Sequence, residues 1–303
     1  MNPLDRLLIH IDVEMDCQPA LARGAWLARE CNSQLHLYSS AYNLYLEEGY
    51  FLEPTDVSRI RQDHIDDIAR QLEALARPLC DEGFGVTHSV GWGTPAWQQI
   101  LEARATYECA MVVASMHTHP RLNVPWVRHQ DWELVRRCPV PLLLAGERTW
   151  NKPPRLLAAV DPTHAHDKPA VLDQEILALA RNLDTQLFSE LHVGHVIDER
   201  KVPEQYLEAV RQYHLEQFQR VSKPLGLPQD NLHFVAGEVE EELARLVREI
   251  DADVLLMGAV RRGPLDAMLI GSTTERTMHY LDCDLLTVKP EWADIVDTVE
   301  LEC

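Results

Sequence analysis

The same succession of predicted elements occurs twice along this chain of 303 residues. A short apolar run at residues 4–12 ends in Asp12, and a similar run at residues 155–161 ends in Asp161. In both halves, further apolar runs then alternate with amphipathic helical patterns. Strands that alternate with helices are typical of an α/β fold with a parallel sheet covered on both faces. The recurrence predicts a tandem duplication of such a domain.

Matching residues in the two halves support the duplication. Cys138 corresponds to Cys283 just ahead of the last predicted strand, and His64 corresponds to His214 in the two long helical patterns. Pro153 and Pro154 mark a linker. We therefore predict domains at residues 1–150 and 151–303, each of about 150 residues, which is an ordinary size for a doubly wound domain.

The periodicity locates the elements of each half. Strands are predicted at 4–12, 34–39, 85–90, 110–114 and 140–144, and again at 155–161, 186–193, 232–235, 254–257 and 285–288. Helices are predicted at 18–31, 54–81, 95–105 and 131–137, and again at 174–182, 203–223, 238–250 and 273–280.

Charge and cysteine usage restrict the class of protein. The formal net charge is −20, which argues against sequence-independent binding to nucleic acid or to anionic lipid. No apolar run reaches the ~20 residues of a membrane-spanning helix. Residues 1–16 are predicted to form a first strand and not a signal peptide. The seven cysteines are an odd number without a C-x-x-C motif, which favours a reducing cytoplasm.

A Gly-containing loop follows the apolar run at 254–257. Gly258 ends that run, and Gly271, Ser272 and Thr273 open the next predicted helix. Ser272 and Glu275 have the spacing of a capping box. Free backbone N–H groups at a helix start favour an anion such as phosphate. The alternative is a strand–helix turn with an ordinary cap.

Gly258, Gly271 and Ser272, together with residues 283–288, resemble the C-terminal signature of the universal stress protein family. In nucleotide-binding members this signature is Gly, two residues, Gly, nine residues, then Gly-Ser or Gly-Thr. Here Arg261 stands where the second glycine would fall, and Gly263 comes two residues later. With residues 131–139, the resemblance extends over nearly the whole chain and is to the tandem, two-domain members.

The resemblance implies the fold and the pairing of the halves. Each half is expected to be a five-stranded, parallel, doubly wound domain of strand order 3-2-1-4-5, similar to the adenine-nucleotide alpha-hydrolases. Single-domain relatives dimerise through their last strands, so an intrachain pseudo-dimer is expected here. Association of two whole chains into a homodimer is left open.

The strand order predicts where a ligand would bind. In such a sheet, ligands lie past the carboxyl ends of the strands where the order reverses. In the second half this point brings together six candidate ligand-binding residues: Asp161, Gly258, Arg261, Gly271, Ser272 and Thr273. By the resemblance the ligand is ATP or a similar nucleotide. Arg261 could supply charge to it, or could block the close approach that a glycine allows.

The first half is not expected to bind a nucleotide. Trp126 aligns with Gly271, and a bulky indole cannot form a phosphate cradle. Asp12 is retained, but an acid at a strand end is usually a turn or cap residue. An apolar cavity lined by Trp126, Trp132 and the segment 38–51 is the alternative, although most tryptophans belong to a core.

Other histidines and carboxylates give weaker signals. His117, His119, His164 and His166 could bind zinc, but closely spaced histidines without a third ligand are usually exposed loop residues. His64 and His214 are expected to be satisfied, partly buried helix residues. No Ser/His/Asp order or paired-carboxylate motif indicates hydrolysis, so no catalytic residue is predicted.

The leading hypothesis is a cytoplasmic tandem universal stress protein that is not an enzyme and that binds a small ligand or a protein partner in the stress response. One alternative is an ATP-binding switch or slow ATPase that uses the second half. Another is a carrier of an apolar or lipid-like ligand.

Overall fold

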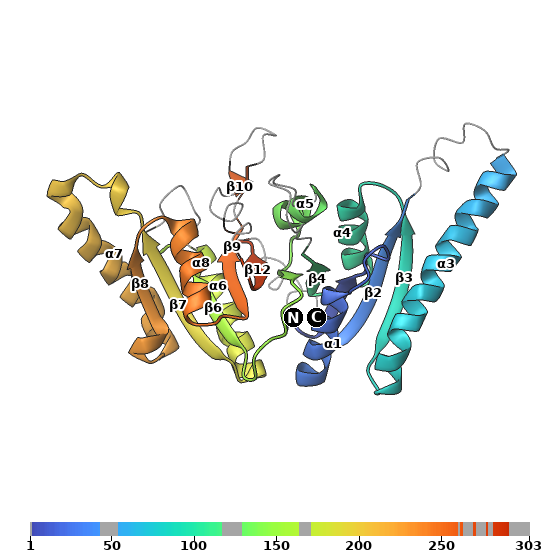
Figure 1. Cartoon of the computed structure of the whole chain (residues 1–303), viewed down its shortest axis with the longest axis horizontal. Coiled ribbons are helices and arrows are strands. Elements are labelled where there is room, and N and C mark those ends of the chain that lie inside the picture. The colour runs from blue at the N-terminus through green and yellow to red at the C-terminus, as the bar shows by residue number, and fades with distance from the viewer. Residues whose placement is uncertain are drawn as a thin grey trace, which may run out of the picture. The chain divides into compact units, whose positions relative to one another are not determined.

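The computed structural model describes residues 2–42, 54–116, 129–163, 171–259, 261–262, 269–270, 277 and 281–290. By its internal contacts the chain divides into two units (Figure 1). The first unit holds residues 1–122 and 126–134, and the second holds residues 123–125 and 135–303. Each unit is described by itself below.

The first unit contains a parallel sheet of strand order β3-β2-β1-β4. Its strands are β1 (Arg6–His10), β2 (Gln34–Ala41), β3 (Val86–Trp92) and β4 (Met111–Ser115). Its helices are α1 (Pro19–Cys31), α3 (Pro54–Asp81) and α4 (Ala96–Thr106), while α5 (His129–Arg137) contains the division between the units. In the central strand β1, Leu8 is in register with His36 of β2 and Val112 of β4.

Apolar side chains explain why β1 is central. Leu7, Leu8 and Ile9 are completely buried, as a strand covered on both faces requires. Gly24 brings α1 against this strand, because a Cβ atom there would lie 2.5 Å from Cδ1 of Ile9.

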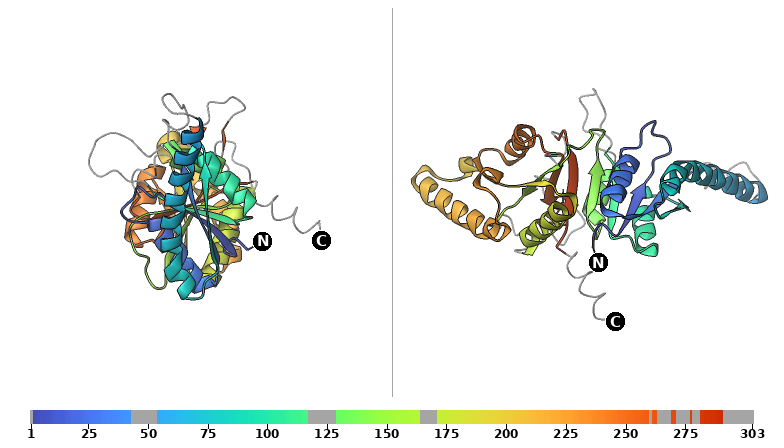
Figure 2. Two further views of the ribbon diagram at one scale, coloured as in Figure 1. Left: turned by 90° about the vertical axis from the view of Figure 1, so that its right-hand side faces the viewer. Right: turned by 90° about the horizontal axis from the view of Figure 1, so that it is seen from below.

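The second unit has the same arrangement of parallel strands and one parallel strand more. Its parallel strands are β6 (Arg155–Ala159), β7 (Glu190–Ile197), β8 (Leu232–Ala236), β9 (Val254–Gly258) and β12 (Asp284–Val288). They lie in the order β8-β7-β6-β9-β12, which is 3-2-1-4-5 by position along the chain. The helices are α6 (Val171–Leu187), α7 (Leu207–Ser222) and α8 (Val239–Glu249). Figure 2 shows helices on both faces of each unit's sheet.

Shorter elements complete the second unit. Strands β10 (Arg261–Arg262) and β11 (Leu269–Ile270) pair in antiparallel orientation. Single-turn 3₁₀ helices occur at Glu199–Lys201, Glu204–Tyr206, Lys223–Leu225 and Gln229–Asn231. Within the described residues, no helix is long and apolar enough to cross a membrane.

Strand β5 (Leu142–Ala145) pairs with the second unit's last strand. Leu144 and Leu143 lie opposite Leu285 and Leu286 of β12 in antiparallel register. By the contacts between its residues, the chain therefore divides after Leu134, and this point precedes the linker prolines Pro153 and Pro154. The division of the repeats near residue 150 stays a prediction about the duplication.

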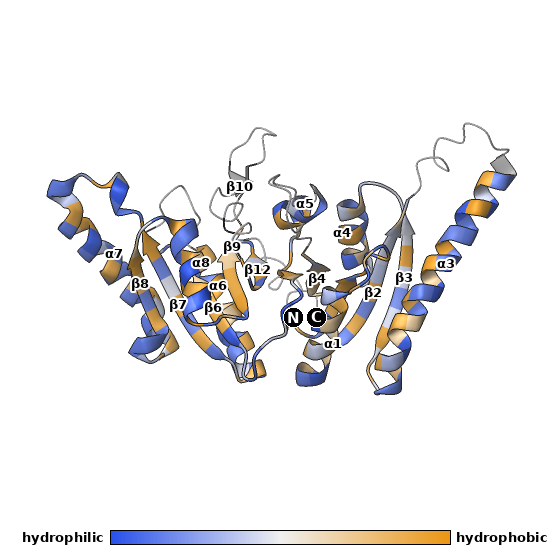
Figure 3. Ribbon diagram, viewed as in Figure 1, coloured by the Kyte–Doolittle hydropathy of each residue, from blue (hydrophilic) through white to orange (hydrophobic). Residues whose placement is uncertain are grey.

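The predicted α/β class with a mostly parallel sheet is confirmed, and apolar residues predominate on the central strand β9 (Figure 3). Some predicted boundaries were wrong. The strand predicted at 186–193 begins at Glu190, because α6 continues to Leu187 and ends at Phe188 in a left-handed conformation (φ 49°). Of the helix predicted at 273–280, only Thr277 lies within the described residues, where it is helical.

Candidate ligand-binding site of the second unit

Two of the predicted ligand-binding residues lie at one edge of the second unit's sheet. Asp161 follows β6, and Gly258 ends the adjacent parallel strand β9. Because Ala158 is in register with Leu256, the carboxyl ends of both strands lie side by side. The strand order reverses between them, so this edge is the switch point at which α/β sheets bind ligands.

The remaining predicted residues belong to the segment after β9. The backbone of Arg261 lies in β10, where it pairs with Ile270. Sequence periodicity did not predict this pairing, because two-residue strands are too short to show a period. Gly271, Ser272 and Thr273 lie outside the described residues. Their predicted role at a phosphate cradle stays a prediction.

Asp161 is held by hydrogen bonds to its own turn and to helix α6. The hydroxyl of Thr163 donates to Oδ1 of Asp161 at 3.0 Å. The backbone N–H of Asp161 donates to Oδ1 of Asp173 at 3.1 Å, and Asp173 is buried at the start of α6. The carboxylate of Asp161 is half-buried and can accept further hydrogen bonds from a hydroxyl or an amine.

Gly258 lets the first turn of α6 approach the end of β9. A Cβ atom on Gly258 would lie 2.4 Å from Cδ2 of Leu172, the second residue of the helix. In the first unit, the corresponding strand and helix contact each other through different residues. There Ser115 ends β4, and its hydroxyl oxygen accepts a 3.2 Å hydrogen bond from the backbone N–H of Ala20, the second residue of α1. At this contact the smaller residue is Gly258, on the strand, in the second unit and Ala20, on the helix, in the first unit.

Two histidines, one on β7 and one on α7, lie close to this edge of the sheet. His195 of β7 is 2% exposed, and its Nδ1 lies 3.0 Å from the carbonyl oxygen of Val160, the residue before Asp161. Its Nε2 lies 2.9 Å from Nδ1 of His214 on α7. A carbonyl only accepts hydrogen bonds, so His195 carries its proton on Nδ1 and accepts from His214 at Nε2. This pair is called the histidine clasp below.

Burial lowers the pKa of both histidines of the clasp. For His195 the desolvation outweighs its hydrogen bond to Val160 and the attraction of Asp161. For His214 it outweighs the attraction of Asp161. The prediction that His214 is a satisfied, partly buried helix residue is confirmed. Sequence reasoning missed His195 and Asp173; the only signal for His195 was a polar residue within an apolar strand.

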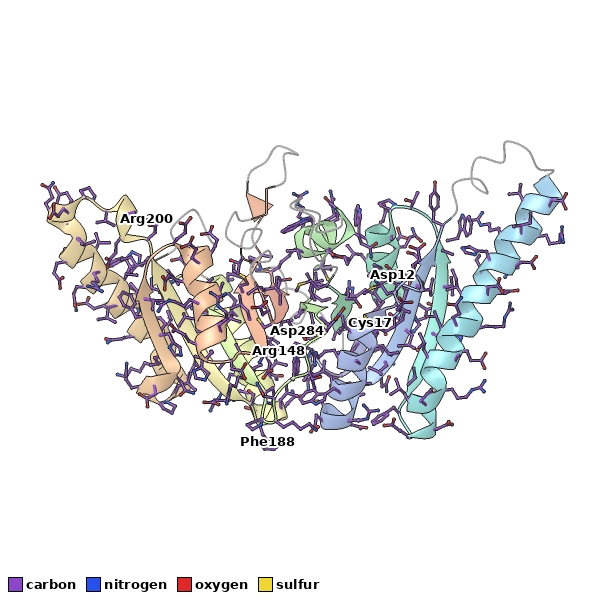
Figure 4. The ribbon with its side chains drawn as sticks, in the orientation of Figure 1. Asp12, Cys17, Arg148, Phe188, Arg200 and Asp284 are labelled. Carbon is purple, nitrogen blue, oxygen red and sulfur yellow. The ribbon has the colours of Figure 1, made fainter. Side chains whose placement is uncertain are left out.

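In the first unit, Asp12 is a turn residue, as predicted (Figure 4). Its Oδ1 accepts a 3.0 Å hydrogen bond from the backbone N–H of Glu14, and its carbonyl accepts one of 2.7 Å from Gln18 Nε2. His64, the counterpart of His214, is half-buried and has its ring edge-on to Trp92, with 6.3 Å between ring centroids.

Several further candidates fall where the structure gives no description. Trp126, His117, His119, His164 and His166 lie outside the described residues, as does most of the segment 38–51. Trp132 is half-buried on α5. Among the described residues, no group of three or more metal-binding side chains occurs. The apolar cavity of the first half stays a prediction.

The described cysteines are free thiols. Cys109, Cys138 and Cys283 are buried within apolar surroundings. Burial raises the pKa of Cys109 to about 11 and that of Cys283 to about 12. These thiols are part of the core.

Comparison with known proteins shows which family the chain is similar to. Residues 154–289 match the model of the universal stress protein family. The chain is 24% identical over 302 residues to Universal stress protein E of Escherichia coli K12, with 96% of each chain covered. The predicted resemblance to tandem universal stress proteins is confirmed.

Solved structures share the fold. A protein of Pseudomonas aeruginosa described as functionally unknown matches with a TM-score of 0.74 at 22% identity, over 99% of this chain and 98% of that chain. A universal stress protein from Archaeoglobus fulgidus matches with a TM-score of 0.65 at 15% identity, over 95% and 99% of the two chains. At these identities the likeness concerns the fold alone.

Proposed function

We propose that this chain, whose residues 154–289 match the model of the universal stress protein family, is a cytoplasmic stress-response module. In the proposal it binds a small ligand or a protein partner without turning over a substrate. The similarity to Universal stress protein E over 96% of the chain supports the stress-response role. The cysteine usage supports the reducing compartment.

The ligand site of this proposal is the switch point of the second unit. The observation that carries it is the position of Asp161 and Gly258 at the carboxyl ends of the adjacent strands β6 and β9. Asp161 has a half-buried carboxylate that can accept from a ribose hydroxyl or an adenine amine. In the proposal, Arg261, Gly271, Ser272 and Thr273 line the phosphate side of the site.

ATP is the first ligand to test. The family's nucleotide-binding signature has glycine where this chain has Arg261, so the same site either uses the guanidinium as a phosphate partner or is closed by it. These two cases differ in what replacement by glycine does. Removal of a phosphate partner weakens binding, whereas removal of a steric block strengthens it.

The test is equilibrium binding of ATP with magnesium to the full chain, measured by isothermal titration calorimetry. The variants are Arg261→Gly, Gly271→Trp and Asp161→Asn, with Asp12→Asn as the matched control in the first unit. Binding that is lost in Gly271→Trp and weakened in Asp161→Asn, but kept in Asp12→Asn, supports a nucleotide site in the second unit.

The other outcomes choose between the alternatives. Measurable release of inorganic phosphate by a protein that binds ATP would make the slow ATPase the better description. Binding only in Arg261→Gly would mean that the cradle is retained and closed. Absence of binding in the unaltered chain and in every variant would contradict a nucleotide ligand, and apolar ligands and protein partners would then be tested.

A further inference from the structure

We propose that the histidine clasp, His195 with His214, is a proton-sensitive contact that holds α7 on the sheet of the second unit at neutral pH and releases it in mild acid. This inference is independent of the ligand proposed above. It rests on the geometry of two imidazoles from different elements and on the light packing of α7.

Proton counting shows why the clasp is sensitive to acid. In the neutral pair, His195 donates from Nδ1 to the Val160 carbonyl, and His214 donates from Nδ1 to Nε2 of His195. One added proton can bind to Nε2 of His214, because neither hydrogen bond of the clasp uses that atom. A second proton must go to Nε2 of His195. There two N–H groups would face each other, so the contact breaks.

Charged groups face the pair from the neighbouring elements. Asp161, after β6, attracts a proton to both rings, and Asp173, on α6, attracts one to His195. From α7 itself Tyr213 lies edge-on to His214, and from β8 the ring of Phe234 lies against His195. Desolvation of the rings outweighs the two carboxylates, so the pair stays neutral at neutral pH. Release of α7 removes this desolvation, so the released rings bind protons more readily and acid favours the released state.

Helix α7 buries few of its residues fully. Its buried residues are Phe218 and Ser222, both near its C-terminal end. Phe218 packs against His195 and Phe234, with ring centroids 6.0 Å and 6.2 Å apart. In contrast, α6 buries nine residues along its length. The N-terminal half of α7 has no fully buried residue. Besides His214 it is held by the half-buried Leu207 and Val210 and by the ion pair of Arg211 with Glu199 at 3.4 Å, and it is the part that acid would release first.

Hydrogen–deuterium exchange of the full chain tests this, with peptides from residues 207–216 followed at about pH 7.5 and about pH 5.5. Rates are corrected for the intrinsic pH dependence of exchange and compared with peptides from α6. We expect the protection of the α7 peptides to fall at least ~10-fold more than that of α6. An equal fall in both helices, or no fall, would overturn the proposal.

Two variants isolate the clasp. In His214→Asn the side-chain amide occupies the place of Nδ1, donates to His195 and does not titrate, so the pH effect on α7 should shrink to less than ~3-fold. The matched control is His64→Asn, at the corresponding position of α3, which should keep the full effect. An effect that persists in His214→Asn but disappears in His233→Gln would overturn the proposal, because His233 pairs with His192 instead.

A second measurement applies if His214→Asn does not fold. Long-range ¹H–¹⁵N spectra of the unaltered chain, labelled at histidine, report the protonation of each ring nitrogen. We expect one proton on Nδ1 of both His195 and His214 at about pH 7.5, and proton uptake over the pH range in which α7 loses protection. A charged His195 at neutral pH, or loss of protection without proton uptake by these rings, would refute the proposal.

Discussion

The indole Nε1 of Trp150 donates a 2.9 Å hydrogen bond to Oδ2 of Asp284, and both residues are buried. The other carboxylate oxygen accepts a 2.8 Å hydrogen bond from the backbone N–H of Gly146. Nearby, Asp253 accepts from the backbone N–H groups of Asn151 and Arg155. The segment between β5 and β6 is thus fixed to the second unit by buried carboxylates and is not a free tether.

Removal of the Asp284 carboxylate should destabilise the second unit. In Asp284→Ala, the N–H groups of Trp150 and Gly146 lose this acceptor in a buried site, so we expect a loss of about 2–4 kcal/mol in the free energy of unfolding. Urea denaturation of the full chain measures it. The matched control, Asp230→Ala, changes an exposed aspartate and should stay within about 0.5 kcal/mol of the unaltered chain. Equal effects of both changes would contradict a structural role for Asp284.

The contact between Gly258 and Leu172 predicts a coupled pair of substitutions. Gly258→Ala should cost about 1–3 kcal/mol, because its Cβ would overlap the leucine. Leu172→Ala should cost about 2–5 kcal/mol by leaving a cavity. The double variant should lose less than the sum by about 1–2 kcal/mol. Gly85→Ala is the control, since its Cβ would meet its nearest atom at 3.7 Å. Additive effects of the two changes would show that the residues are not coupled in this way.

The imidazole of His36 should remain neutral at pH values well below the ordinary pKa of histidine. Its ring nitrogens lie 2.8 Å from the hydroxyls of Thr87 and Ser89, and burial lowers its pKa to about 4. The unfolded chain takes up a proton near the ordinary value of about 6.5. Acidification therefore favours unfolding, and the stability contributed by the neutral ring is lost as the pH falls from about 6.5 toward about 4.

For His36 we expect this loss to be about 1–2 kcal/mol, after allowance for solvent screening. Histidine spectra recorded over a pH series give the pKa of His36 directly. Unfolding free energies at about pH 7 and about pH 5 give its contribution when His36→Gln is compared with the unaltered chain. A His36 ring that titrates at its ordinary value would contradict the burial argument.

The rate at which each cysteine thiol reacts should depend on how deeply the residue is buried. Cys17 and Cys80 are exposed, whereas Cys109, Cys138 and Cys283 are buried. Because the thiolate is the reactive form and burial raises the pKa of Cys109 and Cys283, iodoacetamide should modify the exposed pair first. Peptide mass spectrometry of the native chain measures the order. Modification of Cys283 as fast as Cys17 would show that β12 opens readily.

The sequence by itself determined the kinds and the order of the longer elements. Apolar runs and helical periods are local patterns, so α3 was predicted at its observed bounds and β9 to within one residue. The candidate ligand edge was also predictable for Asp161 and Gly258, because carboxyl ends of adjacent parallel strands meet at one edge.

Only the tertiary structure decided which distant side chains meet. Trp150 and Asp284 are 134 residues apart, and their hydrogen bond requires β5 to pair with β12. His195 and His214 come from a strand and a helix whose periods give no information about each other. A periodic pattern states which face of an element is buried, but the partner on that face depends on how the elements pack. For that reason the linker contacts and the histidine clasp emerged only from the folded chain.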